Sequence, residues 1–314
     1  MKINKNIDIL KFVMAFGILW LHILDNVVIG SYLANQLMWK ILLQSIVPAF
    51  FIISGFFMPR HDDKDFDIKI DKAFMSNLKL LIIGEIIYSV LCIMFGYIYF
   101  QRFLFDIDSV LIGNHLWFLV SILFAIYIYK KMHTEKRITI VIASSFAILS
   151  IVYISELVLG FGIKDSYLLI ILLYNVVYAS CLLFSGIYIR NFNIDYLKDN
   201  RIILLILAFA VSMVLGYLEY IRVGSFMRCR AEEIPSAIML FIFILYLPQI
   251  NISDKISFNL RKFSTSLYIC HYGFTMGFAK LAKDGTINIP SYIFICVVCS
   301  IIAALIFQKL YKFK

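Results

Sequence analysis

Long apolar stretches separated by short polar segments repeat along the whole chain. A bilayer core of about 30 Å is crossed by roughly 20 apolar residues in a helix. The ten stretches here are continuously apolar rather than alternating, which favours helices over the strands of an outer-membrane barrel. They cover residues 8–30, 38–58, 78–100, 115–130, 138–159, 167–189, 201–221, 234–250, 264–282 and 289–308. The pattern predicts an all-α, polytopic integral membrane bundle of about ten transmembrane helices.

The composition agrees with this prediction and excludes other classes of protein. Of the 314 residues, 62% are hydrophobic and only 16% are charged, against roughly 25% charged in soluble domains. A soluble globule of this length could not bury so much apolar surface, so a soluble enzyme, a disordered chain and a secreted disulfide scaffold are excluded. Because the polar segments are short, we expect a single membrane domain over 1–314, with no separate soluble domain.

The net charge of +9 is a topology signal. With ten spans, 21 of the 29 lysines and arginines fall in segments on one side of the membrane. The positive-inside rule places this side, and with it both termini, in the cytoplasm. We therefore expect a multi-pass protein of the cytoplasmic (inner) membrane, surrounded by membrane lipids and without a nucleic-acid partner.

The first stretch carries three residues that are costly in a membrane, Lys11, His22 and Asp25. Titratable side chains inside a span are rare and commonly functional. Eleven residues come within about 20° of three full turns, so Lys11 and His22 share a helix face, about 16 Å apart. Asp25 follows three residues after His22, where a carboxylate orients an imidazole. This grouping favours a functional site over a snorkelling lysine and a packed histidine.

Further candidate residues lie at the cytoplasmic end of the second stretch and in the segment that follows it. A serine–glycine pair permits close helix approach or a local break, and alone it is typical of helix packing. The segment 60–72 mixes both charge signs, as solvated loops do, yet its cations could face a phosphorylated donor. The residues concerned are Ser54, Gly55, Arg60, Lys69 and Lys72.

The fourth and ninth stretches carry further candidates. His115 and Trp117 open the fourth stretch at its outer face, where an interfacial belt tryptophan and a surface histidine are an equal alternative. Tyr268 and His271 are three residues apart in the ninth stretch and so share a face. His271 is expected near mid-membrane, where it needs a polar partner.

The segment between the seventh and eighth stretches carries dense charge on the outer side, including Arg228, Arg230 and Glu232. An anionic or polyhydroxylated ligand would explain arginines that run against the general bias. Salt bridges within the loop explain them equally well. No metal is expected, because Cys296 and Cys299 lie in an apolar stretch without nearby histidines or carboxylates.

Four segments together resemble the membrane-bound acyltransferase-3 family. They are Asp8–Lys11 with His22, matching the family's basic-x10-His signature; Phe50–Phe56 (FFIISGF); His115–Leu119 (HLWFL); and Ser264–His271 (STSLYICH). The resemblance covers nearly the whole chain. Lys11 stands where the family more often has arginine, which keeps the charge without the bidentate fork. We expect no counterpart of the extra-cytoplasmic esterase-like domain that some members carry.

The resemblance implies an O-acyltransferase of the bacterial cell envelope. An acyl group, usually acetyl, would pass from cytoplasmic acetyl-CoA or another acyl-CoA to a hydroxyl of a surface polysaccharide or lipid-linked glycan. We expect His22 to act as general base or as acyl acceptor, with Asp25 orienting it. The expected donor-binding residues are Lys11, Arg60, Ser54, Gly55, Lys69 and Lys72. The expected acceptor-binding residues are His115, Trp117, Arg228, Arg230, Glu232, Tyr268 and His271.

Two other classes of function stay open. A line of polar residues through a helical bundle also describes a transporter or exporter of an amino acid or exopolysaccharide. A scaffold subunit of a glycan-assembly complex is the other alternative. Dependence on the thioester would indicate the enzyme, and vectorial uptake without it would indicate the transporter. A homodimer is one option for its assembly.

Overall fold

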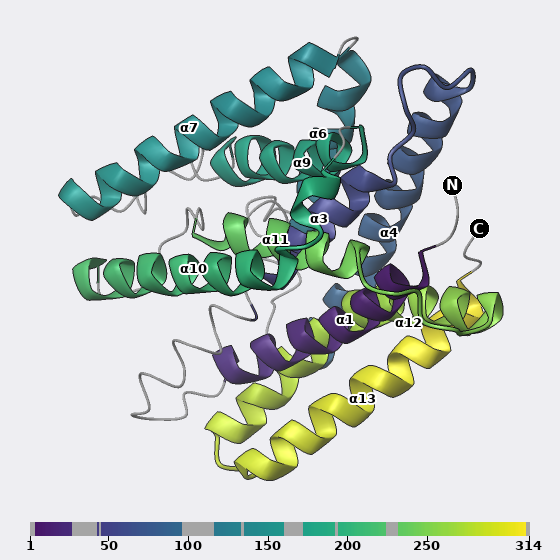
Figure 1. Ribbon diagram of the computed structural model, residues 1–314. Helices are drawn as coiled ribbons and strands as arrows, with labels where there is room; N and C mark the ends of the chain where they lie inside the picture. Colours follow the sequence, from purple (N-terminus) through teal and green to yellow (C-terminus); the bar gives the residue numbers. More distant parts are fainter. Residues whose placement is uncertain are drawn as a thin grey trace. The chain divides into compact units, whose positions relative to one another are not determined.

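The computed structural model describes residues 4–26, 43, 45–95, 116–132, 135–159, 172–191, 194–223 and 232–311. Over these residues the chain forms ten α-helices, one π-helix and one short 3₁₀-helix, and no strand (Figure 1). Each predicted stretch overlaps one of these α-helices. The all-α prediction is therefore confirmed.

Several helices have the length and composition of membrane spans. In the described part of the chain five qualify: Lys5–Leu24, Phe66–Leu91, Lys136–Ser155, Arg201–Leu218 and Ile289–Leu310. Ile46–Phe56 and Glu233–Leu245 are apolar but shorter. Membrane crossing by ten helices and the cytoplasmic termini stay predictions.

Two helices begin well before their predicted apolar stretches. α4 (Phe66–Met94) starts before residue 78, and α12 (Asp254–Lys283) starts before residue 264. The side chain of Ser253 caps α12 by accepting a hydrogen bond from the Ile256 N–H, at 3.3 Å. The polar first turns of both helices contain no proline or glycine. An apolar stretch predicts which residues can lie in the hydrocarbon core of a membrane. It does not predict at which residue the helix begins.

The chain divides into two compact units. Unit 1 comprises Met1–Ala34, Leu80–Val110 and Leu247–Lys314, and unit 2 comprises Asn35–Lys79 and Leu111–Tyr246. The helix α4 contributes residues to both units. The expectation of a single domain over 1–314 stays a prediction, and each unit is described by itself.

In unit 1, α1 (Lys5–Asn26) packs along α12, and α12 packs along α13 (Ile289–Leu310) (Figure 1). Ala15, Leu19 and Ile23 are almost fully buried on one face of α1 and belong to the core of this unit. Their spacing of four residues is the period of a helix face. The same helix therefore presents a regular apolar face to its neighbours.

The turn between α12 and α13 has a left-handed residue, Gly285, with φ of +73°. Its N–H donates to the Ala282 carbonyl at 3.2 Å, in the manner of a helix C-cap. Asn288 then caps α13 by accepting a hydrogen bond from the Ser291 N–H at 2.9 Å. These caps let the chain reverse within a few residues and hold α13 against α12.

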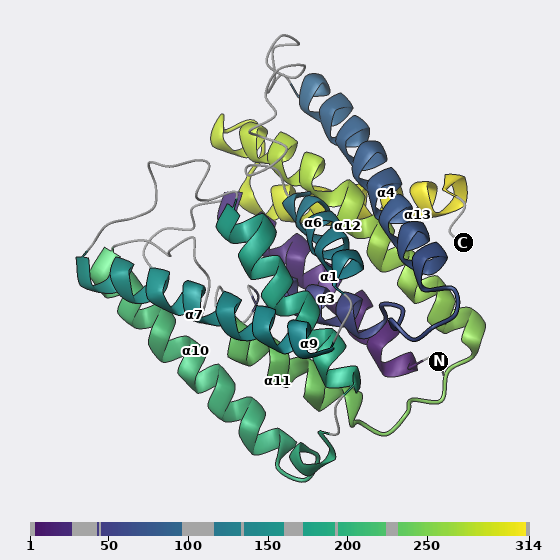
Figure 2. The same ribbon diagram turned by 90° about the horizontal axis from the view of Figure 1, so that it is seen from above.

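Unit 2 holds the remaining helices. They are α3 (Ile46–Phe56), α6 (Trp117–Lys131), α7 (Glu135–Leu159), π-helix η3 (Leu172–Tyr178), α9 (Ala179–Asn191), 3₁₀-helix η4 (Asp195–Leu197), α10 (Arg201–Val223) and α11 (Glu233–Leu245). Figure 2 shows the long helices α7 and α10 approaching each other at one end. There the Tyr153 hydroxyl donates to the Leu215 carbonyl at 2.7 Å.

The closest helix packing in unit 2 joins α3 and α9 through two glycines. A Cβ atom on Gly55 would lie 1.8 Å from the Leu183 carbonyl oxygen, and one on Gly186 would lie 2.0 Å from the Ile52 carbonyl oxygen. Real Cβ atoms do not approach backbone so closely, so only glycine fits at both positions. The two helices therefore touch backbone to backbone, as small residues permit in membrane bundles.

Candidate active site

Within unit 1, the two histidines predicted in different helices meet. The ring centroids of His22 in α1 and His271 in α12 are 5.2 Å apart. His271 is fully buried, and its Nδ1 lies 3.0 Å from the Leu267 carbonyl oxygen and 2.9 Å from the Tyr268 carbonyl oxygen. Both neighbours can only accept, so in the neutral ring Nδ1 carries the proton and Nε2 is the basic nitrogen.

Aromatic side chains surround this histidine pair. The Tyr272 ring lies 4.7 Å from His22, edge to face, and the Tyr268 ring lies 6.0 Å from His271. From α4, Tyr88 packs on Tyr272 with 5.5 Å between ring centroids. The structure therefore brings together three of the predicted site residues, His22, His271 and Tyr268.

Glu85 also belongs to this region, and the sequence prediction did not include it. It lies on α4 three residues before Tyr88, and one of its carboxyl oxygens is buried. It interacts electrostatically with Tyr268. The signal was available, because a carboxylate inside the apolar stretch 78–100 is itself an indication of function.

The N-terminal parts of α1 and α12 share a charged cluster, which we call the Asp8 cluster. Asp8 and Lys11 come from α1, and Ser257 and Arg261 come from α12. The nearly buried Asp8 carboxylate accepts both fork nitrogens of Arg261 at 2.8 Å and the Ser257 hydroxyl at 2.5 Å. Lys11 interacts electrostatically with Asp8 and Arg261. Since Arg261 balances Asp8, the formal charge of the cluster is +1.

In unit 2, the predicted serine–glycine pair has visible packing roles. The Ser54 hydroxyl donates to the Phe50 carbonyl of its own helix at 2.8 Å. Gly55 is buried in the close contact with α9. These contacts agree with the packing alternative that the sequence left open, and a donor contact at either residue stays a prediction.

The predicted cations of segment 60–72 lie in and after a turn between α3 and α4. Arg60 and Lys72 are exposed, and Lys69 forms an ion pair with Asp63 at 3.4 Å. The Arg60 N–H donates to the same Asp63 carboxylate at 3.3 Å. This backbone hydrogen bond, aided by Lys69, lowers the pKa of Asp63 below its ordinary value.

Two side chains that the sequence prediction missed hold this turn in place. Arg190 of α9 donates to the Met58 carbonyl, and the Tyr129 hydroxyl of α6 donates to the Pro59 carbonyl at 2.9 Å. Both donors serve backbone carbonyls just before Arg60. The turn that carries Arg60 is therefore fixed by α6 and α9.

Two of the predicted acceptor residues lie in unit 2. The Trp117 ring packs 5.9 Å from Phe51, and Glu232 is buried at the start of α11. Beside it the buried Glu233 accepts a hydrogen bond from the Tyr178 hydroxyl at 3.2 Å. Tyr178 ends the π-helix η3, a conformation that is frequent at functional sites.

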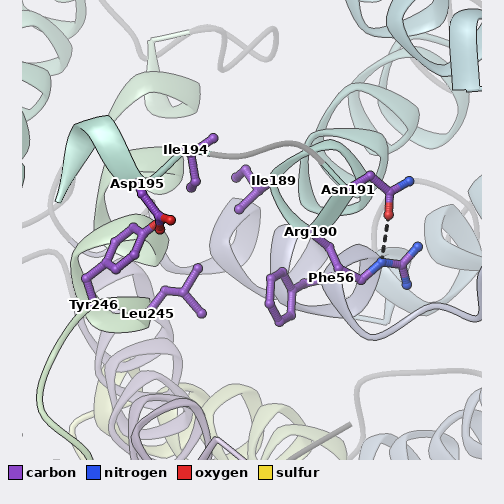
Figure 3. A pocket seen from close by; sticks show the side chains of 8 residues that line it. All are labelled: Phe56, Ile189, Arg190, Asn191, Ile194, Asp195, Leu245 and Tyr246. Carbon is purple, nitrogen blue, oxygen red and sulfur yellow. Dashed lines mark hydrogen bonds between the residues drawn. The ribbon is translucent and has the colours of Figure 1, made fainter.

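A cavity of about 340 Å³ opens at the C-terminal ends of α3, α9 and α11 in unit 2 (Figure 3). Phe56, Ile189, Ile194 and Leu245 form its apolar wall, and its polar lining is Arg190, Asn191, Asp195 and Tyr246. Tyr246 donates to Asp195 at 2.9 Å, and Arg190 donates to Asn191 at 3.1 Å. Figure 3 shows the Arg190 guanidinium pointing toward Asn191 and away from Asp195. None of these lining residues was among the predicted site residues.

Some predictions fall outside the described residues. They concern His115, Arg228 and Arg230, while Asp25 lies in the last turn of α1 with a side chain that is not described. The described residues contain no group of three histidines, cysteines or carboxylates able to hold a metal ion. The expectation that no metal is needed stays a prediction.

The fold and the polar groups define a class: an all-helical chain with helices long enough to cross a membrane and a histidine pair between two of them. The sequence model of the acyltransferase-3 family, described as an acyltransferase domain, matches residues 4–308. The chain therefore belongs to this family, and it is in general terms a membrane acyltransferase. The comparisons with curated proteins and with solved structures gave no match.

Proposed function

We propose that the protein is a multi-pass O-acyltransferase of the cytoplasmic membrane, with ten spans and cytoplasmic termini. In this proposal it moves an acetyl group from acetyl-CoA to a hydroxyl of a surface polysaccharide or lipid-linked glycan. The observation that carries the proposal is the approach of His22 and His271 to 5.2 Å in a chain of this family. A histidine pair between apolar helices supplies the base that acyl transfer to a hydroxyl needs.

His22 acts as the base in this mechanism. It takes the proton of the acceptor hydroxyl while the hydroxyl oxygen attacks the thioester carbonyl carbon. The carbon–sulfur bond breaks, and the imidazolium returns the proton to the departing CoA thiolate. His271 and Tyr272 pack against His22, and Tyr268 packs against His271. Asp25 orients the imidazole, and the alternative in which His22 itself carries the acyl group has the same residue requirements.

Each unit, taken by itself, carries cations that are candidates for binding the donor phosphates. In unit 1 the Arg261–Asp8 ion pair is neutral, so the formal charge of the Asp8 cluster is +1, that of Lys11. In unit 2 Arg60 stands exposed on a turn that α6 and α9 fix, with Lys69 and Lys72 after it. Cations on a turn that is already fixed lose less conformational entropy when they bind phosphate. On the outer side, Trp117 and Glu232, with His115, Arg228 and Arg230, hold the acceptor.

The test uses purified protein with radiolabelled acetyl-CoA and candidate glycans. We expect His22→Gln to lower turnover about 100-fold or more. His61→Gln is the matched control, because it makes the same change at a histidine that packs between Phe66 and Tyr129 in unit 2. Normal turnover by His22→Gln would remove His22 from the mechanism. An acid-quenched, acetylated wild-type protein would establish the acyl-histidine route, and vectorial uptake without acyl-CoA would establish a transporter instead.

Donor binding has a separate test. We expect Arg60→Gln to weaken CoA binding roughly 10-fold, because a charge-assisted contact is lost. Lys64→Gln removes an exposed charge four residues away and is the control. If both variants bind CoA as the wild type does, Arg60 does not contact the donor.

A further inference from the structure

We infer that Glu85 is a positioning residue that acts through Tyr268 on the histidine pair, an inference that rests on the proposed function of that site. Glu85 lies in an apolar helix whose residues Phe66–Leu91 are long enough to cross a membrane. A carboxylate there is costly and is retained where it serves a polar partner. The contacts of α4 with α12 in unit 1 identify that partner.

The C-terminal part of α4 packs against α12 with matching register. The side chain of Leu91 occupies the space over Gly273, where a Cβ would lie 2.6 Å from its Cδ1. One turn further, the ring of Phe95 fills the space over Gly277, where a Cβ would lie 2.1 Å from the ring. Residue numbers increase in the same direction along both segments from the first contact to the second. The chain at the end of α4 and α12 therefore run parallel in this region.

The parallel packing continues toward the N-termini of both helices. Tyr88 packs on Tyr272 with 5.5 Å between ring centroids. One turn before Tyr88 is Glu85, and one turn before Tyr272 is Tyr268, each on the same helix face as its successor. Parallel packing therefore sets Glu85 beside Tyr268, in agreement with the electrostatic interaction between the two side chains.

Tyr268 connects this carboxyl group to the catalytic histidines. Its ring lies 6.0 Å from His271, and the His271 ring lies 5.2 Å from His22. A phenol hydroxyl rotates freely unless an acceptor fixes it, and a carboxylate is the strongest acceptor in this setting. Glu85 fixes the Tyr268 hydroxyl, and its negative charge favours the imidazolium that forms as the acceptor hydroxyl loses its proton. Glu85 touches no substrate in this arrangement.

The kinetic test compares Glu85→Gln, Glu85→Asp and Tyr268→Phe, with Ser89→Ala as control. Ser89 is buried on the same helix and donates only to the backbone carbonyl of Glu85 among its described contacts. We expect Glu85→Gln to lower kcat about 10- to 100-fold with little change in the KM for acetyl-CoA. Glu85→Asp recovers part of kcat because it keeps the charge. In the Tyr268→Phe background, Glu85→Gln has little further effect.

Infrared spectroscopy of the protein without substrate supplies the second measurement. The carboxyl band that disappears in Glu85→Gln is expected to shift in Tyr268→Phe and to stay in place in Ser89→Ala. An unshifted band in Tyr268→Phe, or additive kinetic losses in the double variant, overturns the inference. If the wild type transfers no acetyl group, the proposed function fails, and the infrared result still decides whether Glu85 and Tyr268 are coupled.

Discussion

The two units join their central helices by different kinds of contact. In unit 1, α1 and α12 meet through the Asp8 cluster and the histidine pair. In unit 2, α3 and α9 meet through Gly55 and Gly186, backbone against backbone. A polar contact can lose a group and keep its shape, whereas a glycine contact has no space for a single added methyl group. The polar contact between α1 and α12 is therefore suited to catalysis, and the glycine contact between α3 and α9 is suited to holding two helices in fixed positions.

The largest expected effect is at the glycine contact. Gly55→Ala places a Cβ 1.8 Å from a backbone carbonyl that can move only if α3 and α9 separate. We expect a loss of at least about 3 kcal/mol, enough to prevent recovery of folded protein. Gly273→Ala in unit 1 is the comparison, since its Cβ would meet the flexible side chain of Leu91 at 2.6 Å. Equal yields and equal unfolding midpoints in SDS titrations would contradict this difference.

The next effect concerns the ion pair between α1 and α12. Asp8→Ala leaves Arg261 and Ser257 without their shared acceptor, and we expect a loss of about 2 kcal/mol. The loss stays below that of a fully buried pair because the Arg261 side chain is 42% exposed. Asp254→Ala breaks the Lys5–Asp254 pair, which joins the same two helices at 3.0 Å with Asp254 76% exposed.

The exposed pair is expected to contribute less than about 1 kcal/mol. SDS titration of both variants measures the two losses side by side. A larger loss for Asp254→Ala would mean that the Asp8 cluster does not anchor α1 to α12.

The helices and part of the site were predictable because both depend on local patterns. Apolar length located every predicted helix, and the eleven-residue spacing predicts that Lys11 and His22 share one helix face. The meeting of His22 with His271 follows from which helices pack together, which apolar length does not encode. Glu85 was visible as a charge in an apolar stretch, but its pairing with Tyr268 needs the register of α4 on α12. The role of Arg190 at the Met58 carbonyl likewise depends on a contact between residues far apart in sequence.

A smaller effect is expected at the turn that carries Arg60. Tyr129→Phe removes the hydroxyl that donates to the Pro59 carbonyl, at a cost of about 1 kcal/mol. The control is Tyr127→Phe, because Tyr127 lies on the same helix with 55% of its surface exposed. Thermal unfolding in detergent measures both. If the two variants are equally stable, the turn does not depend on α6.

The smallest effect is a pH dependence of the same turn, which tests whether a charged contact in unit 2 resembles those of unit 1. The pKa of Asp63 is lowered by the Arg60 N–H and then by Lys69. A carboxyl group with a lowered pKa stabilises the fold at neutral pH, and this contribution is lost as the pH falls through the lowered value. Hydrogen exchange of residues 60–69, corrected for intrinsic rates, is therefore expected to lose protection only in acid.

Asp63→Asn is expected to make that protection nearly independent of pH, and to change global stability very little because the pair is exposed to solvent. Asp62→Asn, at the adjacent exposed carboxylate, keeps the pH dependence of the wild type. If Asp62→Asn removes it instead, the Arg60 turn is not closed by Asp63. The contact of Asp63 with Lys69 and the Arg60 N–H would then not order the turn in unit 2. Of the two charged contacts compared, only the Asp8 cluster would order the residues around it.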